Sequence, residues 1–494
     1  MKVVCHLDPE PRTRTAAFQQ RQRKSWRTHA FGKPALFPSC SFSRRGVLAR
    51  VGMVAGGAIA LATACSPAAP TVLEADQEPV ALVSAPSAPV VASADTKLGE
   101  LIERAPESIV AGERPNFGLL RRFYARHDFA PVWTTRQSQA NSLINAVLRA
   151  GDHGLAPELF HANLLRSPAT LPVLDRELLL SNAFLSYADA LARGAVPVER
   201  RRDDEALVPE PVDIAAALDA AIDSPDPAAA IEALAPDTPT YRRLRQALRS
   251  YRAGIPAGGK AATPRLRAIE VNLERERWLP RRLPADRVWV NVADERLVLY
   301  RDDRPVFSTR VIVGQDEERN QSPEFEASID GILFNPPWNI PPDIAANEIL
   351  PKARHDPNYL ARHNMVVLPD GGLQQLAGAN SGLGQLMFEM RNRFDVYLHD
   401  TPSKNLFSRN DRRISHGCIR VENPRKLAAL LMQQPVDAID QAIATGSTTR
   451  SDLPKPVPVF VVYETAFADV DGRLQFRADV YGRDAEIWRS LNPK

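Results

Sequence analysis

The sequence has 494 residues, enough for two or three domains, because single hydrophobic cores stop growing well below this length. Its composition is that of a globular protein, with 44% hydrophobic and 24% charged residues, but the 42 prolines predict long irregular connections. Residues 1–64 hold eleven Lys and Arg against Asp8 and Glu10, a charge of +9. Since the net charge of the chain is +3, the remaining residues carry a charge of −6. This acidic remainder lacks the phosphate attraction that drives nucleic-acid binding, so no nucleic-acid partner is expected.

The N-terminal segment has the pattern of an export signal. Residues 43–45 read Ser-Arg-Arg and precede an uncharged run, 51–64, which is too short to span a bilayer and ends in small residues. The paired arginines resemble a twin-arginine signal, with a general secretory signal as the alternative. We therefore expect residues 1–65 to direct the protein to the periplasm.

Four cysteines are present: Cys5, Cys40, Cys65 and Cys418. The first two precede the expected cleavage point, and Cys65 follows it directly, where lipidation would anchor the protein to a membrane. After such processing Cys418 is the only thiol of the folded part, which excludes an intramolecular disulfide framework. A single thiol retained in an exported protein suggests a functional role.

Residues 66–96 are predicted to form an extended linker. The stretch 66–95 contains five prolines and neither glycine nor an aromatic residue, so it cannot bury a core. Residues 97–255 show helical periodicity instead, for example at Leu119, Leu120 and Phe123, and predict a helical scaffold domain.

Two local predictions concern the helical domain. Asp175 is expected to cap a long helix that Gly194 ends. The charged segment 199–205 reads as a solvated connection without a function.

A β-rich domain is predicted for residues 265–485. One more helix is expected at 265–278, after which the period changes to two, first at Val288 and Val290. The same pattern recurs at the residues 297–300, 306–313, 457–463 and 474–480. The expected fold class is therefore α+β.

Two short segments, 396–400 and 414–421, carry the residues with chemical potential. Strand alternation places Tyr397 with His399 on one face of the first segment, and Cys418 with Arg420 on one face of the second. Gly417 allows the backbone to approach a ligand closely. We expect both polar faces to line one groove.

A cysteine acts as a nucleophile only as the thiolate, and its ordinary pKa near ~8.5 calls for a neighbouring base or positive charge. His399, His416 and Arg420 offer both. Two other readings remain open. Cys418 could be a buried structural residue, or it could bind zinc with His416, His399 and Asp400, although these spacings match no common structural site.

These residues resemble the L,D-transpeptidase catalytic family, called the YkuD type, whose signature is an upstream His followed by Ser-His-Gly-Cys and Arg. The likeness extends to residues 335–342, 356–360 and 399–404. The helical stretches 117–133 and 182–194 are similar to the scaffold domain of the large periplasmic members. The resemblance implies a mainly antiparallel, β-sandwich-like catalytic domain with a capping insertion at about 335–390.

The resemblance also implies a reaction on peptidoglycan. Cys418 would attack the carbonyl between diaminopimelate and the terminal D-alanine of a tetrapeptide stem, releasing D-alanine. The acyl group would then pass to the side-chain amine of diaminopimelate in a second stem. No metal or cofactor is implied. His399 would act as the base, held by a backbone carbonyl, and His416 would support the site.

Further residues are expected to stabilise the oxyanion or to bind substrate. They are Tyr397, Ser415, the amides of Gly417 and Cys418, Arg420 and Trp338. For Trp338 the alternative is an aromatic ring that packs the base of the cap.

The sequence departs from the larger relatives in one respect, because residues 251–265 leave no room for a separate peptidoglycan-binding module. The linker and a lipid on Cys65 would then position the enzyme. Alternative functions are an L,D-carboxypeptidase, with water as acceptor, an enzyme that attaches a lipoprotein to peptidoglycan, and a non-catalytic wall-binding scaffold. The sequence leaves the acceptor and the oligomeric state open.

Overall fold

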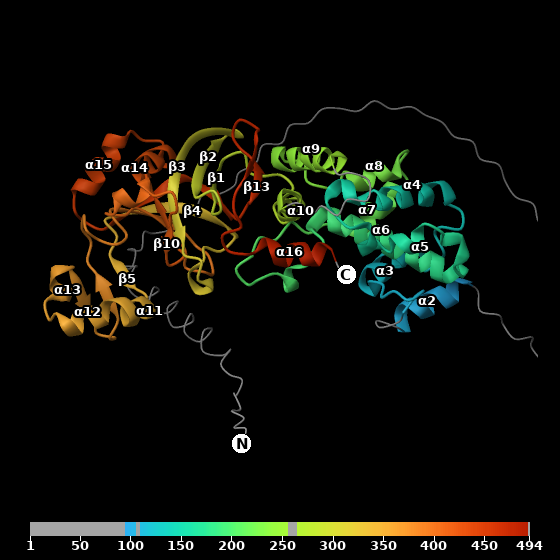
Figure 1. Ribbon diagram of the computed structural model, residues 1–494, viewed down its shortest axis with the longest axis horizontal. Coiled ribbons are helices and arrows are strands. Elements are labelled where there is room, and N and C mark those ends of the chain that lie inside the picture. The colour runs from blue at the N-terminus through green and yellow to red at the C-terminus, as the bar shows by residue number, and fades with distance from the viewer. Residues whose placement is uncertain (1–93, 105–108, 255–263, 493–494) are drawn as a thin grey trace, which may run out of the picture. The chain divides into compact units, whose positions relative to one another are not determined.

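The computed structural model describes residues 94–104, 109–254 and 264–492 (Figure 1). The expected export signal, Cys65 and nearly all of the linker lie outside the described residues. Within those ranges, no helix combines the length and apolar character needed to cross a membrane.

The first half of the described chain is helical, as predicted (Figure 1). Its central helix, α6 (Val173–Arg193), is buried along most of its length, and α3, α4, α7 and α8 contact it. The remaining helices of this half are α2 (Ala94–Arg104), α3 (Phe117–Tyr124), α4 (Gln137–Leu148), α5 (Ala162–Leu165), α7 (Ile214–Ile222), α8 (Pro227–Glu232), α9 (Pro239–Ala253) and α10 (Pro264–Glu276).

The ends of α6 match the prediction on one side only. As predicted, the helix ends at Gly194. Gly194 has a φ of +94°, which residues with a side chain rarely adopt. It begins after Pro172, so Asp175 lies within the first turn and not at the cap. There its carboxylate still interacts favourably with the helix dipole.

The second half contains a nine-stranded sheet with the order β10-β3-β11-β9-β8-β4-β12-β1-β2. Because β2 also pairs with β3, the sheet closes on itself. The strands are β1 (Arg287–Asn291), β2 (Arg296–Arg301), β3 (Arg304–Gly314), β4 (Phe325–Phe334), β8 (Leu386–Met390), β9 (Leu398–His399), β10 (Arg413–Ser415), β11 (Ile419–Val421) and β12 (Thr449–Val462).

This topology confirms a helical region followed by a β-rich domain, but it is not clearly a sandwich, since the strands belong to one closed sheet. Most neighbouring strands run antiparallel; the parallel pairs are β1 with β12, β3 with β10, and β9 with β11. The sheet encloses apolar side chains such as Val290, Ile329 and Phe388. Helices α14 (Pro424–Met432) and α15 (Val436–Ala444) add residues to the same core.

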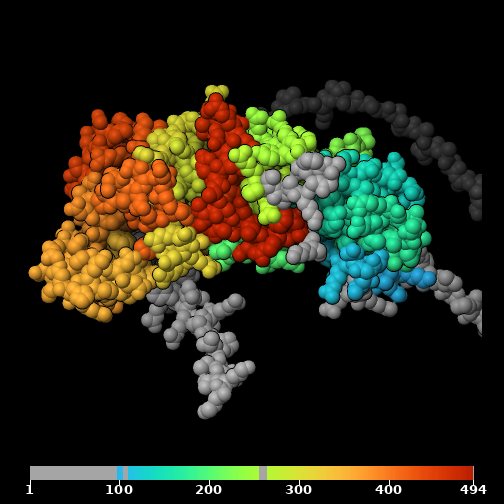
Figure 2. All heavy atoms as spheres, viewed as in Figure 1, coloured from blue at the N-terminus to red at the C-terminus, as the bar shows by residue number. Residues whose placement is uncertain are grey.

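A small subdomain, here called the cap, lies between β4 and β8, inside the interval where the sequence predicts an insertion. It has its own hydrophobic cluster, which includes Ile340, Ile349 and Leu373. Figure 2 shows it in light orange as a lobe of the surface. Its elements are β5 (Trp338–Ile340), α11 (Pro342–Ile344), the π-helical turn η7 (Ala345–Ile349), α12 (Leu350–His355), α13 (Tyr359–Arg362), β6 (Met365–Val367) and β7 (Leu373–Gln375).

The C-terminal segment returns to the helical half (Figure 1). It forms β13 (Ala466–Ala468), β14 (Leu474–Phe476) and α16 (Asp484–Leu491), where α9 contacts β13 and α10 contacts α16. Phe460 and Val462 of β12 belong to the same core cluster as the helices. The helical and β-rich halves therefore share part of one core.

Candidate active site

Strands β9 and β11 bring the two predicted segments side by side. They pair in parallel, with Ile419 opposite Leu398 and Arg420 opposite His399. Ile419 and Leu398 are fully buried in the core of the sheet. Since side chains alternate between the faces of a strand, Arg420 and His399 lie together on the opposite face, in line with Cys418 and Tyr397.

Cys418 follows a turn at Gly417, which has a φ of +107°. Its thiol is half-buried, with Sγ 3.9 Å from the carbonyl oxygen of Asp395. Burial raises the pKa of the thiol, while a backbone hydrogen bond from Tyr397 and the charge of Arg420 act in the opposite direction. The resting group at neutral pH is therefore the thiol and not the thiolate.

His399 is buried, and its Nδ1 lies 2.6 Å from the carbonyl oxygen of Asp400. Because a carbonyl can only accept, this contact calls for the hydrogen on Nδ1, which leaves Nε2 as the unprotonated nitrogen of the neutral ring. Burial, aided by the positive charge of Arg420, lowers the pKa of His399 to about 4. The ring is therefore neutral at pH 7 and can accept a proton.

His416 contacts the cap. Its Nε2 lies 2.5 Å from Oε1 of Glu348, which belongs to the π-helical turn. Such turns occur frequently at functional sites. The pair joins the loop before Cys418 to the cap, a contact that the sequence did not predict.

Ser415 is buried and holds the turn at Gly417 together. Its Oγ accepts a hydrogen bond from the Gly417 N–H at 3.2 Å and donates one to the Cys418 carbonyl at 2.6 Å. The Gly417 amide and the Ser415 hydroxyl are thus bound to each other within the loop. Their expected roles in oxyanion or substrate binding stay predictions.

Tyr397 and Arg420 are half-buried beside the thiol. Burial, with the nearby Asp395 and Cys418, raises the pKa of Tyr397 to about 12, so its hydroxyl remains a hydrogen-bond donor. Burial lowers the pKa of Arg420. Nε of Arg420 is buried and has no hydrogen-bond partner among the described residues.

Trp338 is half-buried in β5 and packs against the hydrophobic cluster of the cap. Its ring lies over Gly382, where an added Cβ would approach ring atoms to 3.0 Å. These contacts fit the packing alternative, and a substrate-binding role for Trp338 stays a prediction.

A cavity of about 420 Å³ lies beside Asp400, with Lys404, Glu422 and Arg425 in its wall. Cys418 and His399 are not among the residues that line it. Among the described residues, no group of three or more His, Cys, Asp or Glu side chains is arranged to hold a metal ion. The zinc reading of Cys418 therefore has no support from this geometry.

Ser322, Glu348 and Arg483 contact the loop 415–418 or connect to it, and sequence reasoning missed all three. Ser322 donates to the Gly417 carbonyl at 2.7 Å, and Arg483 donates to the Ser322 carbonyl at 3.1 Å. No local pattern marks them, because they reach the loop only through tertiary packing.

Comparison with known proteins matches both halves of the chain. Residues 118–248 match the model of a scaffold domain, and residues 285–459 match that of the YkuD family, the L,D-transpeptidase catalytic domain. A Haemophilus influenzae protein assigned as an L,D-transpeptidase is 28% identical over 402 residues, which cover 75% of this chain and 78% of that protein.

Solved structures with similarity to the chain include two L,D-transpeptidases, both at a TM-score of 0.19. One is a cysteine-to-serine mutant of the Enterococcus faecium enzyme, at 10% identity over 36% of this chain and 50% of that chain. The other is L,D-transpeptidase 3 of Mycobacterium tuberculosis with a faropenem-derived adduct, at 13% identity over 37% and 62%. On the two domain matches, the chain contains a YkuD-family L,D-transpeptidase catalytic domain, residues 285–459, preceded by a scaffold domain, residues 118–248.

Proposed function

We propose that this protein cross-links peptidoglycan as an L,D-transpeptidase that uses Cys418 as nucleophile and His399 as base. The observation that supports the proposal is the parallel pairing of β9 with β11, in which Arg420 lies opposite His399 and Cys418 directly precedes the paired Ile419, together with the contact of His399 Nδ1 with the Asp400 carbonyl. The family assignment of residues 285–459 supports the same reaction class.

In the first half-reaction, Nε2 of His399 takes the proton of the thiol as Sγ attacks the carbonyl between diaminopimelate and terminal D-alanine. The C–N bond of the resulting tetrahedral adduct then breaks. D-Alanine leaves as an amine with the proton from His399, and the acyl group remains on Cys418 as a thioester.

In the second half-reaction, the side-chain amine of diaminopimelate in another stem attacks the thioester. His399 accepts the amine proton and returns it to the departing sulfur, so that the thiol is regenerated. The product is an amide between two diaminopimelate residues. Tyr397, which stays protonated, and Arg420, whose Nε has no partner in the described part of the chain, would bind the oxyanion or a substrate carboxylate.

The place of action follows from the N-terminal sequence. A twin-arginine-like pattern at 43–45 and the short apolar run after it favour export to the periplasm, with Cys65 available for a lipid anchor. In that compartment the stem peptides of peptidoglycan are accessible, and residues 66–96 would let an anchored enzyme reach them.

The test is incubation of the purified protein with a disaccharide-tetrapeptide, followed by mass spectrometry of the products. A cross-linked dimer that has lost one alanine is expected, and the Cys418→Ala variant should form none. Tripeptide without dimer would instead identify an L,D-carboxypeptidase. If the products are the same with and without Cys418, the proposed function is wrong.

A further inference from the structure

The turn at Gly417 and Cys418 is held from two sides by hydroxyl groups. On one side, Oγ of Ser415 binds the Gly417 N–H and the Cys418 carbonyl. On the other side, Oγ of Ser322 donates to the Gly417 carbonyl at 2.7 Å. Three of the four backbone polar groups of these two residues are thereby fixed, and the Cys418 N–H remains.

The direction of that N–H follows from the Ser322 contact. In a planar trans peptide, the carbonyl oxygen and the amide hydrogen point in opposite directions. Since the Gly417 carbonyl points to Ser322, which is fully buried, the Cys418 N–H points away from Ser322. Among the described residues it has no backbone acceptor.

The hydroxyl hydrogen of Ser322 is also fixed. Its Oγ accepts a hydrogen bond from the Gly314 N–H at 3.0 Å, which leaves its own hydrogen for the Gly417 carbonyl. The segment that carries Ser322 packs closely on Gly314, where an added Cβ would lie 1.9 Å from the carbonyl oxygen of Asn320.

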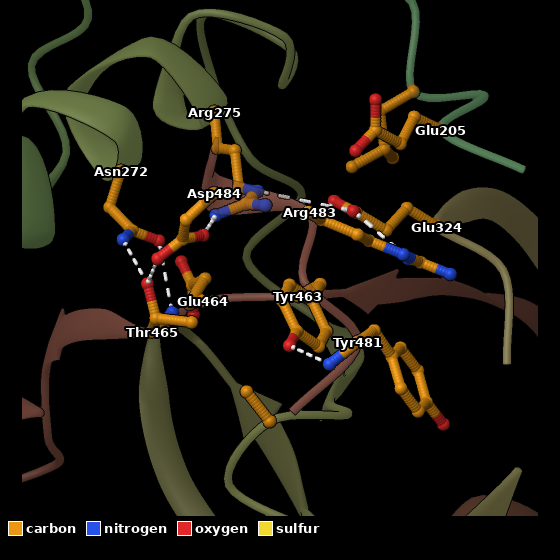
Figure 3. A network of polar contacts seen from close by, with 12 residues as sticks. Glu205, Asn272, Arg275, Glu324, Tyr463, Glu464, Thr465, Tyr481, Arg483 and Asp484 are labelled. Carbon is orange, nitrogen blue, oxygen red and sulfur yellow. Dashed lines mark hydrogen bonds and ion pairs between the residues drawn. The ribbon is translucent and has the colours of Figure 1, made fainter. Parts of the chain in front are cut away.

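Arg483 and Tyr481 anchor the same segment from the C-terminal end of the chain. Arg483 is fully buried and donates to the Ser322 carbonyl at 3.1 Å and to Oε1 of Gln321 at 3.2 Å. The Tyr481 hydroxyl donates to the Gly314 carbonyl at 2.6 Å. Figure 3 shows Arg483 beside Glu324, to which it is bound at 3.2 Å.

We infer that Ser322 is a positioning residue for catalysis: it holds the Gly417–Cys418 peptide so that the Cys418 N–H can donate to the oxyanion formed on the substrate carbonyl when Sγ attacks it. Arg483 and Tyr481 support it. The inference rests on the proposed function only in taking Cys418 as the nucleophile. Preorganised backbone donors of this kind act because they need no reorientation as charge develops.

Two reactions of the same thiol separate this role from a general effect on the fold. Acylation of Cys418 by a p-nitrophenyl ester passes through an oxyanion, whereas its alkylation by iodoacetamide does not. Both rates are to be measured on the full-length protein, with peptide mapping to follow Cys418 alone. The test variants are Ser322→Ala and Ser322→Thr. The control is Ser181→Ala, which removes another buried hydroxyl, in the scaffold domain.

Ser322→Ala is expected to slow acylation by about 10- to 100-fold, which is no more than the effect of removing a whole oxyanion donor. The rate of alkylation should stay within about twofold of the wild-type rate. Ser322→Thr should restore most of the acylation rate, and Ser181→Ala should change neither rate. With tetrapeptide, kcat should fall and KM should not.

Equal slowing of both reactions, or no change in either, would overturn the role of Ser322. Should Ser322→Ala fail to fold, Tyr481→Phe carries the same test, with a smaller loss of acylation alone. A wild-type protein that reacts with the ester but not with tetrapeptide would refute the proposed substrate and leave the inference about Ser322 standing.

Discussion

At the scale of single residues, the two groups that are proposed to react, the Cys418 thiol and the His399 imidazole, are both neutral at pH 7. Burial raises the pKa of the Cys418 thiol and lowers that of the His399 imidazole. A preformed thiolate–imidazolium pair would need shifts in the opposite directions. The proton is therefore expected to move from sulfur to His399 when the substrate carbonyl is attacked.

This charge state predicts the pH dependence of acylation. The base form of His399 exists above its pKa of about 4, so the acid limb of kcat should lie near that value and not near the ordinary value of ~6.5. Arg420→Gln removes a charge that lowers this pKa, so its acid limb should move to higher pH. An acid limb near ~6.5 in the wild-type protein would contradict a buried, neutral His399.

The same shift predicts a change in stability. Between about pH 4 and ~6.5 the unfolded chain binds a proton at His399 that the folded chain does not, so stability is lost as the pH falls through this window. His399→Gln should reduce this loss, as measured by urea unfolding at pH 4.5 and 7. If the variant loses as much stability between pH 7 and 4.5 as the wild type does, groups other than His399 cause the loss.

Sequence reasoning identified the residues that are close in the chain or follow strand alternation. Cys418 and Arg420 share a short motif, and Tyr397 and His399 share another, so the alternation of side chains sufficed to place them. It could not identify Ser322, which lies 95 residues before Gly417. Its contact depends on how β3 and β4 pack beside the loop.

At the scale of elements, the cap and the segment 320–322 both contact the loop 415–418. The Glu348–His416 pair joins the cap to the loop, and its side chains are 44% and 31% exposed. An exposed pair contributes about 0–1 kcal/mol to folding, but it can still fasten one element to another.

Glu348→Gln should therefore loosen the cap without unfolding the protein. Hydrogen exchange of the amides in residues 342–363 should become faster, because the cap loses a charged contact with the loop, while the melting temperature should stay nearly constant. Glu486→Gln, which changes an exposed carboxylate on α16, is the control. Unchanged exchange in the cap would mean that the pair does not fasten it.

Gly314→Ala should destabilise the catalytic domain. The new methyl group would meet the carbonyl oxygen of Asn320 at 1.9 Å and the Ser322 nitrogen at 2.7 Å, and this backbone has to move. Overpacking of this kind costs about 1–3 kcal/mol, which urea unfolding would detect. Gly254→Ala, where the nearest atom is 3.7 Å away, should cost less. If both substitutions lower the free energy of unfolding equally, the close contact at Gly314 does not cause the destabilisation.

The closed sheet marks the limit of element-level prediction. The strands near Val288, Leu297 and Val306 were apparent from their period of two, but periodicity does not reveal strand order. The parallel pairing of β9 with β11 joins segments that no hairpin connects. The pairing of β2 with both β1 and β3 closes the sheet, whereas the sequence predicted a sandwich-like arrangement.

At the scale of the whole molecule, buried charges join the two halves. The segment 199–205, predicted to be a solvated connection, instead pairs with the catalytic domain: Asp204 binds Arg483 at 2.5 Å, and Glu205 is buried. Arg275 of α10 and Arg483 both approach Glu324 (Figure 3). The prediction failed because charge density alone does not show where opposite charges from distant segments meet.

The buried pair Glu276 and Glu464 predicts a further pH effect. Burial raises the pKa of both carboxyls, and for Glu464 the neighbouring Glu276 adds to the increase. Above the ordinary carboxyl pKa, the folded chain still holds protons that the unfolded chain has released. The free energy of unfolding therefore falls as the pH rises through the pKa values of the folded state.

Glu464→Gln should raise the melting temperature more at pH 8 than at pH 5, because it removes the carboxyl that must lose its proton. Scanning calorimetry at the two pH values measures the difference, and Glu199→Gln, at an exposed position, is the control. A variant that is less stable at pH 8 would show that the pair is stabilising in its ionised form.

Cys418 is proposed to carry the acyl group between two stems. The decisive experiment is rapid quenching of the protein with tetrapeptide in the absence of an acceptor, followed by intact-mass measurement and peptide mapping. An adduct of the donor acyl group is expected on Cys418, with slow formation in His399→Gln and none in Cys418→Ala. Release of D-alanine without any adduct on Cys418 would disprove the proposal.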